Sequence, residues 1–133
     1  MKNLLPKLSP QRLEEIDKYR SYDLRPKKFL KDKLLLRDVL LFHSSPITRH
    51  EAAFTIGHFG LFELMPFLMY VIKNDESVIV QHEACEALGE MKGCAAKEAY
   101  NFLNKVVNDK KKRYHSDVII TIKEAMENLY KSF

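Results

Sequence analysis

The stretch RHEAAFTIG at residues 49–57 returns 32 residues later as QHEACEALG at residues 81–89. His, Glu, Ala and Gly hold the same places in both copies, so the dipeptide His50-Glu51 is repeated as His82-Glu83. A period of about 30–40 residues is typical of proteins built from helical repeats, in which each unit packs against its neighbours. The duplication therefore predicts a helical repeat fold, and the paired ligand residues predict that the repeat holds a metal.

The remainder of the chain also has helical periodicity. Glycine occurs four times in 133 residues, and the apolar residues recur at helical rather than strand spacing. Ser9-Pro10, Ser45-Pro46 and Ser77 place a capping hydroxyl, twice followed by proline, at expected helix starts. We expect one all-α domain of stacked helical hairpins, with helices at about 10–20, 26–42, 46–60, 62–73, 78–93, 95–107 and 116–130.

The repeat divides this single domain, residues 1–133, into unequal units. The two His-Glu repeats cover about residues 45–76 and 77–109. A degenerate first unit covers about residues 9–44, and a terminal capping helix covers about 115–131, because end repeats of such arrays serve as caps. In this last helix Ile119 and Ile120 occupy the places of His and Glu.

Charge and composition exclude several classes of protein. The net charge of +4 is too mild to indicate a nucleic-acid partner. The chain has neither an apolar run long enough to span a bilayer nor the features of a secretory signal. The basic turn at residues 108–113 is expected to be a solvated loop, and Cys85 and Cys94 are expected to be free thiols. We expect a cytoplasmic protein with no nucleic-acid or membrane partner.

A helical wheel separates the His-Glu pairs from the core. In the first copy Ala52 and Ile56 form an apolar stripe, and His50 and Glu51 lie on the other side; the second copy behaves alike. Equivalent positions on stacked helices lie about 9–10 Å apart, so the two imidazoles can converge on one point. Imidazole and carboxylate with open positions suit non-haem iron, and also zinc or manganese. The alternative is a polar surface with no bound metal.

Two glycines and two further polar residues accompany the pairs. Gly57 and Gly89 lie inside helices, where glycine costs about 0.5–1 kcal/mol relative to alanine. Close packing of a neighbouring helix is one explanation, and close approach of a substrate is the other. His58, whose repeat equivalent is Glu90, is a candidate for a residue that does not bind the metal itself but contacts the metal ligands and holds them in place. His43 and His115, at helix ends, are expected at the surface.

The two duplicated stretches resemble those of deoxyhypusine hydroxylase, an enzyme built from HEAT-like repeats. The resemblance covers about residues 25–131, including a third repeat without the dipeptide. It implies a short right-handed α-solenoid of HEAT-like hairpins. It further implies a non-haem di-iron centre, binding Fe²⁺, with dioxygen as co-substrate. The iron ligands would be His50, Glu51, His82 and Glu83.

The same resemblance assigns a substrate groove and raises the question of assembly. Glu86, Gly57 and Gly89 would line the groove, and an acidic Glu86 suits a lysine- or polyamine-like side chain on a protein. Known members carry two such halves with four His-Glu pairs, whereas this chain carries two pairs. We therefore expect a monooxygenase whose two-metal site is completed by homodimerisation. The alternative is a HEAT-repeat protein–protein interaction module without catalysis.

Overall fold

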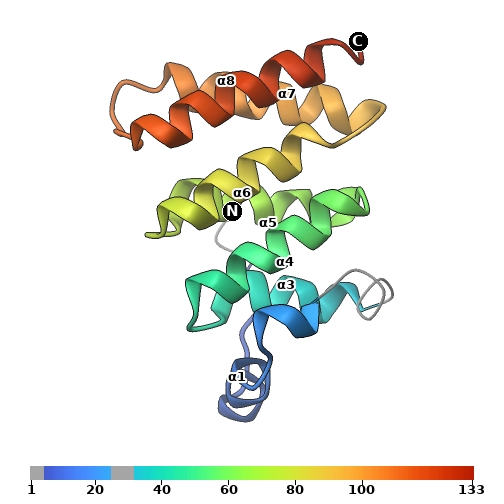
Figure 1. Ribbon diagram of the computed structural model, residues 1–133, viewed down its shortest axis with the longest axis vertical. Coiled ribbons are helices and arrows are strands. Elements are labelled where there is room, and N and C mark those ends of the chain that lie inside the picture. The colour runs from blue at the N-terminus through green and yellow to red at the C-terminus, as the bar shows by residue number, and fades with distance from the viewer. Residues whose placement is uncertain (1–4, 25–31) are drawn as a thin grey trace.

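A computed structural model describes residues 5–24 and 32–133, and these residues form helices and turns without a strand. Figure 1 shows the helices stacked one above another along the long axis. In chain order the elements are α1 (Pro10–Asp17), the 3-10 turn η1 (Ser21–Leu24), α3 (Lys33–Phe42), α4 (Pro46–His58), the 3-10 turn η2 (Phe62–Leu64), α5 (Met65–Asn74), α6 (Val78–Gly89), α7 (Cys94–Asn108) and α8 (Ser116–Tyr130). The predicted all-α repeat architecture is confirmed.

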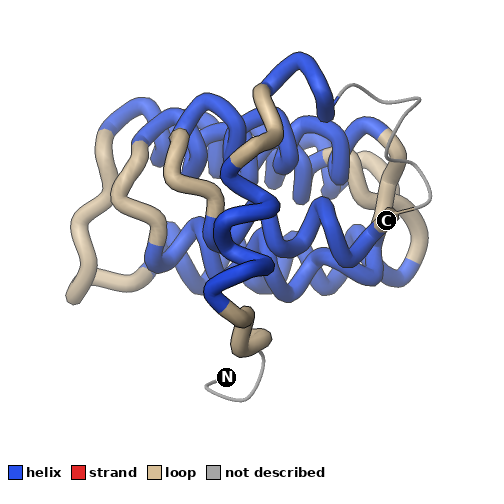
Figure 2. The backbone as a smooth tube through the Cα atoms, turned by 90° about the horizontal axis from the view of Figure 1, so that it is seen from below, coloured by secondary structure: helices blue, strands red, loops and turns tan. Residues whose placement is uncertain are grey.

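The helices pack in two layers. α3 packs on α4, α5 on α6 and α7 on α8, so that α4, α6 and α8 form one layer and α3, α5 and α7 the other (Figures 1 and 2). The packed hairpins thus begin one helix earlier than the His-Glu repeat units defined from the sequence. Fully buried leucine and isoleucine side chains fill the space between the layers: Leu36, Leu40, Ile56, Leu68, Ile72, Leu88, Leu103 and Ile122.

Two of the three predicted capping serines make the expected contact. Ser9 accepts a hydrogen bond from the amide of Arg12, and Ser77 accepts one from the amide of Val80. Ser45 stands at the start of α4, but its side chain makes no capping hydrogen bond. α8 runs over the predicted residues 116–130.

Several helix ends differ from the prediction. The helix predicted over 10–20 ends at Asp17, and the α-helix predicted from residue 62 begins at Met65, after the 3-10 turn η2. The helix predicted from residue 26 begins at Lys33, where Asp32 caps the amide of Leu35; residues 25–31 lie outside the described part of the chain. The helix predicted to reach residue 93 ends at Gly89. The turn that follows contains Gly93 at φ +62°, a conformation that glycine adopts without steric cost.

His43, expected at the surface, is buried, and that expectation was wrong. Its Nε2–H donates to the carbonyl oxygen of Tyr19 at 2.8 Å, and its Nδ1 accepts from the amide of Ser45 at 3.0 Å. The imidazole therefore joins the segment before α3 to the start of α4, because its two nitrogens can serve a donor and an acceptor at once.

A partly buried ion pair fixes α4 relative to the start of α6. The Arg49 guanidinium donates to both carboxylate oxygens of Asp75, at 2.9 and 3.1 Å, and also to the carbonyl of His43. Asp75 in turn accepts from the amide of Ser77, which begins the turn into α6. Paired charges that also satisfy backbone groups hold their elements in one register.

Small residues bring the helices of the α4, α6 and α8 layer close together. A side chain at Gly57 would lie 2.7 Å from the Cα of Ala87, and one at Gly89 would lie 3.1 Å from the Cβ of Ala125. Helix packing therefore accounts for both glycines. Gly57 also borders a cavity, so its predicted place in a substrate groove stays a prediction.

These two contacts also define the register of α8. Position 87 in α6 and position 125 in α8 make the same contact with the preceding helix, so equivalent residues of α6 and α8 are 38 apart. His82 and Glu83 therefore correspond to Ile120 and Thr121. The predicted correspondence with Ile119 and Ile120 is wrong by one residue, because the longer turn before α8 hides the offset in the sequence.

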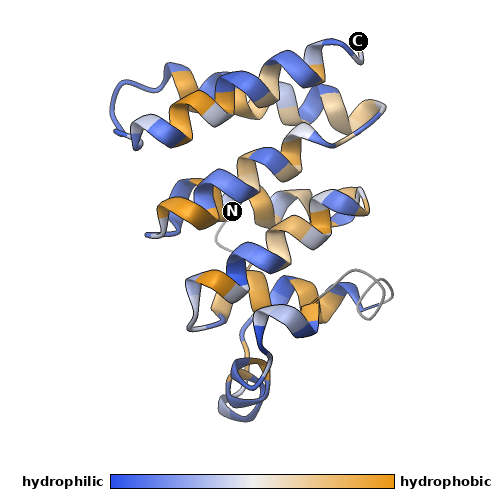
Figure 3. Ribbon diagram, in the orientation of Figure 1, coloured by the Kyte–Doolittle hydropathy of each residue, from blue (hydrophilic) through white to orange (hydrophobic). Residues whose placement is uncertain are grey.

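The outward side of α8 carries charge. Gly89 of α6 lies against α8, whereas its equivalent in α8, Glu127, is exposed. In the same way Cys85 is buried in α6, whereas its equivalent in α8, Lys123, is exposed. The turn that precedes α8 is hydrophilic (Figure 3). None of the helices in the described residues is long and apolar enough to span a bilayer.

The close approach at Gly57 predicts a measurable difference between two glycine substitutions. Gly57→Ala places a methyl group against the backbone of α6 and should lower stability by about 1–3 kcal/mol, as overpacking does. Gly89→Ala meets mainly a side-chain methyl group and should cost less, since alanine favours the helix. Thermal unfolding of both variants tests this, and equal midpoints for Gly57→Ala and wild type would contradict it.

Candidate metal centre

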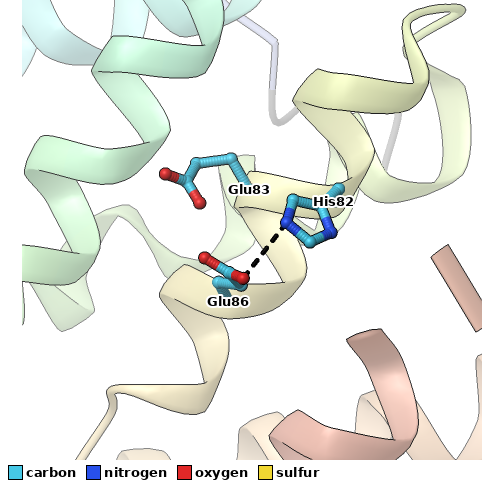
Figure 4. Close-up of side chains that lie close together, drawn as sticks. All are labelled: His82, Glu83 and Glu86. Atoms are coloured by element: carbon cyan, nitrogen blue, oxygen red, sulfur yellow. Dashed lines mark ion pairs between the residues drawn. The ribbon is translucent and has the colours of Figure 1, made fainter. Parts of the chain in front are cut away.

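The His-Glu pairs lie in the contact between α4 and α6, on the outer face of their layer. His50 and Glu51 come from the first turns of α4, and His82 and Glu83 from the same place in α6. In Figure 4 Glu83 extends from α6 toward α4, whereas the side chains of His82 and Glu86 lie side by side on α6. The site is therefore shared by two successive repeats.

Each histidine lies beside a carboxylate. His50 Nε2 is 3.4 Å from Glu83 Oε1, a contact between the two helices. His82 Nε2 is 3.1 Å from Glu86 Oε1, one turn further along the same helix. His50 and His82 are each partly exposed, with 34% and 40% of the side chain accessible, so both rings can be reached from solvent.

One group of three side chains among the described residues has the spacing of a metal site. Ligand atoms of His82, Glu83 and Glu86 all lie within 4.8 Å of one another. The group contains two of the four predicted ligands, together with Glu86, which the resemblance places at the substrate. His50 is not a member, although it touches Glu83, and Glu51 is not a member either. The described structure thus does not gather both imidazoles around one point.

Glu83 is the buried member of the group, with 6% of its surface exposed. Burial, the contact with Glu86 and the charges of Glu86 and Glu51 together raise the pKa of its carboxyl to about 8, and burial contributes most. Within the described residues no lysine or arginine forms an ion pair with any of these three carboxyl groups. A buried carboxylate of this kind requires either a proton or a cation.

The burial of Glu83 departs from the helical wheel, which placed it opposite the core. The wheel describes a single hairpin and takes no account of the repeat beside it. α4 packs along the flank of α6 and covers Glu83, whereas Glu86 and Glu90, further along the helix, remain exposed. A position away from the hairpin core can therefore still be buried between repeats.

A groove runs beside the group, between the later turns of α4 and α6. It has a cavity volume of about 190 Å³ and is lined by aromatic, small and acidic residues: Phe54, Gly57, His58, Glu83, Glu86, Ala87 and Glu90. His58 stacks on Phe54, with ring centroids 5.7 Å apart. His58 and Glu90 thus lie on the wall of this groove, and their predicted role in supporting the metal ligands stays a prediction.

Thr121 is the residue of this site that the sequence did not single out. Its Oγ1 is 2.6 Å from His82 Nδ1, on the side of the ring opposite Glu86. A lone threonine in an apolar helix carries no signal in one sequence. Only the register of α8, which depends on packing, places it beside the histidine.

The chemistry of this donor set fits iron. Imidazole nitrogen and carboxylate oxygen are the ligands of non-haem Fe²⁺ sites, and the carboxyl groups supply the negative charge that a divalent cation neutralises. Among the described residues, the buried Glu83 forms an ion pair only with a histidine. The same set would also accept zinc or manganese.

The raised pKa of Glu83 predicts that the metal-free chain loses stability as pH rises. Between about pH 4.5 and pH 8 the folded chain retains a proton that the unfolded chain has released. The free energy of unfolding is therefore highest at acidic pH and decreases as the pH rises through this range. Glu83→Gln removes this loss. In the presence of a chelator the variant should unfold at a higher temperature than wild type at about pH 8.5, and at the same temperature at about pH 5.

The control for this experiment is Glu90→Gln, which changes an exposed carboxyl group on the same helix face. Its unfolding temperature should track that of wild type at every pH. A difference between Glu83→Gln and wild type that does not vary with pH would contradict the assignment.

Comparison with known proteins agrees with this architecture. A 66-residue segment, 49% of this chain, is 42% identical to deoxyhypusine hydroxylase of Schizosaccharomyces pombe (strain 972 / ATCC 24843) and covers 20% of that enzyme. The chain thus matches only a small part of its relative's length. No solved structure matches. The family model for HEAT repeats matches residues 34–123, which include α4, α6 and most of α8. The chain belongs to the HEAT repeat family.

Proposed function

We propose that this chain is a non-haem iron protein that activates dioxygen to hydroxylate a substrate, in the manner that the name deoxyhypusine hydroxylase implies for its relative. The observation that carries the proposal is the buried carboxyl of Glu83 beside His50, His82 and Glu86 with no lysine or arginine partner among the described residues. A metal cation is the group that such a set of ligands lacks.

The residues that would hold iron are His50, His82 and Glu83, with Glu51 and Glu86 as further carboxylates. Bound iron would supply the dioxygen chemistry that no side chain performs. The chain itself would fix the ligands through the α4–α6 contact, and it would keep Glu83 away from water. Glu86 borders both the ligand group and the groove, so it can act as a ligand or as a contact for substrate.

The groove beside the group suits a cationic side chain. Glu86 and Glu90 line it on α6, and Phe54 and His58 line it on α4. Carboxylates attract and orient an ammonium group, and an aromatic face adds a favourable cation–π contact. We therefore extend the proposal to a lysine- or polyamine-like side chain as substrate, held with its carbon chain toward the ligand group.

The proposal includes a second copy of the chain. One chain offers two histidines, whereas a symmetric pair would bring four to one interface. Exposed apolar residues surround the site on the same face: Ile47, Phe54, Ile79 and Ile120. Ile47 and Ile79 hold equivalent places in the two repeats, and Ile79 and Ile120 border one depression with His82. Apolar residues gathered on one polar face are suited to burial against a partner.

A second candidate function is a HEAT-repeat interaction module without catalysis. The observation that favours it is that both histidines already have carboxylate neighbours, His50 with Glu83 and His82 with Glu86, in the chain without metal. The apolar rim would then contact a protein partner instead of a second copy. The two functions differ in metal content.

Metal analysis of the purified protein tests the proposal. Protein from iron-replete cells should be coloured and hold about one iron per chain, as a two-metal site shared by two chains requires. His50→Ala and His82→Ala should lose the iron, whereas His115→Ala, at the exposed start of α8, should retain it. Colourless protein that takes up no Fe²⁺ under anaerobic conditions would favour the interaction module.

Solution mass tests the shared site. Wild-type protein should be a dimer, and Ile79→Lys or Ile120→Lys should yield monomers, because the charge of a lysine at either position would lose its water in the interface. Leu34→Lys is the matched control, since Leu34 is at least as exposed as the two isoleucines but lies on α3, in the opposite layer. A wild-type monomer that holds two irons would contradict the shared site.

A further inference from the structure

The contact between Thr121 and His82 joins the candidate metal centre to a helix that contributes no metal ligand. His82 Nδ1 is 2.6 Å from Thr121 Oγ1, and Thr121 is 5% exposed. We propose that Thr121 is a positioning residue: it accepts a hydrogen bond from the Nδ1–H of His82 and thereby directs Nε2 toward Glu83 and Glu86. The proposal rests on the proposed function, since it concerns a ligand of the same metal.

The direction of the hydrogen bond follows from the single proton of the threonine hydroxyl. Thr121 Oγ1 is 2.8 Å from the carbonyl oxygen of Asp117, one turn earlier in α8. A carbonyl oxygen can only accept, so the hydroxyl proton belongs to that bond. The oxygen then presents a lone pair to the imidazole, and Nδ1 must carry the proton that fills the 2.6 Å contact.

The other nitrogen of the His82 ring, Nε2, therefore faces the candidate metal site. Nε2 is 3.1 Å from Glu86 Oε1 and lies within the group formed with Glu83. With the proton of the neutral ring on Nδ1, the lone pair of Nε2 is the one available to a metal ion. Histidines that bind metals commonly donate their second N–H to an oxygen, which fixes both the tautomer and the ring orientation.

The register of the repeats explains why a threonine stands here. His50 contacts Glu83, and His82 contacts Thr121, so each histidine touches the same position of the following helix. In α6 that position holds a carboxylate that is itself a candidate ligand. In α8 it holds a neutral hydroxyl, which can orient a ring without adding a further negative charge. α8 thus supports the site even though it lacks the His-Glu dipeptide.

The tautomer of His82 can be measured without any metal. In the ¹⁵N-labelled, metal-free protein at about pH 8.5, where ordinary imidazoles are neutral, wild type and Thr121→Ser should carry the proton on Nδ1. Thr121→Val should move it to Nε2, because Glu86 remains as an acceptor and Nδ1 loses its own. His50 in the same spectrum is an internal control and should not change. Wild-type His82 protonated on Nε2 would overturn the proposal.

The effect on the metal is measured by anaerobic titration with Fe²⁺. Thr121→Val should weaken binding about 10- to 100-fold, the range seen when the outer partner of a ligand is removed, and Thr121→Ser should restore most of it. Thr55→Val is the control, because the buried Thr55 hydroxyl also donates to a backbone carbonyl oxygen, of Leu24 or Glu51, and has no hydrogen bond with an imidazole. Equal affinities for Thr121→Val and wild type would refute the positioning role.

The two measurements separate this proposal from the proposed function. If the wild-type chain binds no Fe²⁺, the proposed function fails, and with it the role of Thr121 toward a metal, even where the tautomer result agrees. If wild type binds Fe²⁺ but His82 is protonated on Nε2, the proposed function stands and only the positioning role of Thr121 is overturned.

Discussion

The close approach of α4 and α6 at Gly57 is the constraint on which the site depends. A methyl group at this position would lie 2.7 Å from the backbone of Ala87, so the helices can meet at this distance only where glycine leaves room. The same approach brings His50 within 3.4 Å of Glu83 and covers the Glu83 carboxyl. Gly57 costs its helix about 0.5–1 kcal/mol, and it sets the distance between His50, two turns earlier in α4, and Glu83, one turn before Ala87 in α6.

The burial of Glu83 carries a desolvation cost, which an interaction with a cation can offset. Removing a carboxylate from water costs several kcal/mol unless a charge or hydrogen bonds replace the water. Here Glu86 and Glu51 add repulsion, and the neighbouring cation is at most an imidazolium. A fold that needed only stability would place an apolar residue there. The arrangement becomes favourable once a divalent cation is bound, since the ion then offsets both the burial and the repulsion.

Much of the fold follows from the sequence, because helix starts and the 32-residue repeat are local signals. Ser9, Ser77 and the limits of α8 were predicted correctly. The features that were missed depend on contacts between elements. The burial of His43 depends on the carbonyl of Tyr19, and the place of Thr121 depends on a register that the turn before α8 conceals. A helical wheel ranks positions around one helix, whereas a repeat protein buries residues between helices.

An array in which each histidine touches the next helix must end on a residue that is not a ligand. His50 meets Glu83, and His82 would meet a further carboxylate if the dipeptide continued into α8. Another carboxylate beside Glu86 would add negative charge to a group of carboxyls that forms no ion pair with lysine or arginine in the described part of the chain. A hydroxyl avoids this, because it is neutral and can still accept from an imidazole. The loss of the dipeptide in the third repeat is therefore compatible with a supporting role for that repeat, since all the proposed ligands of one chain lie on α4 and α6.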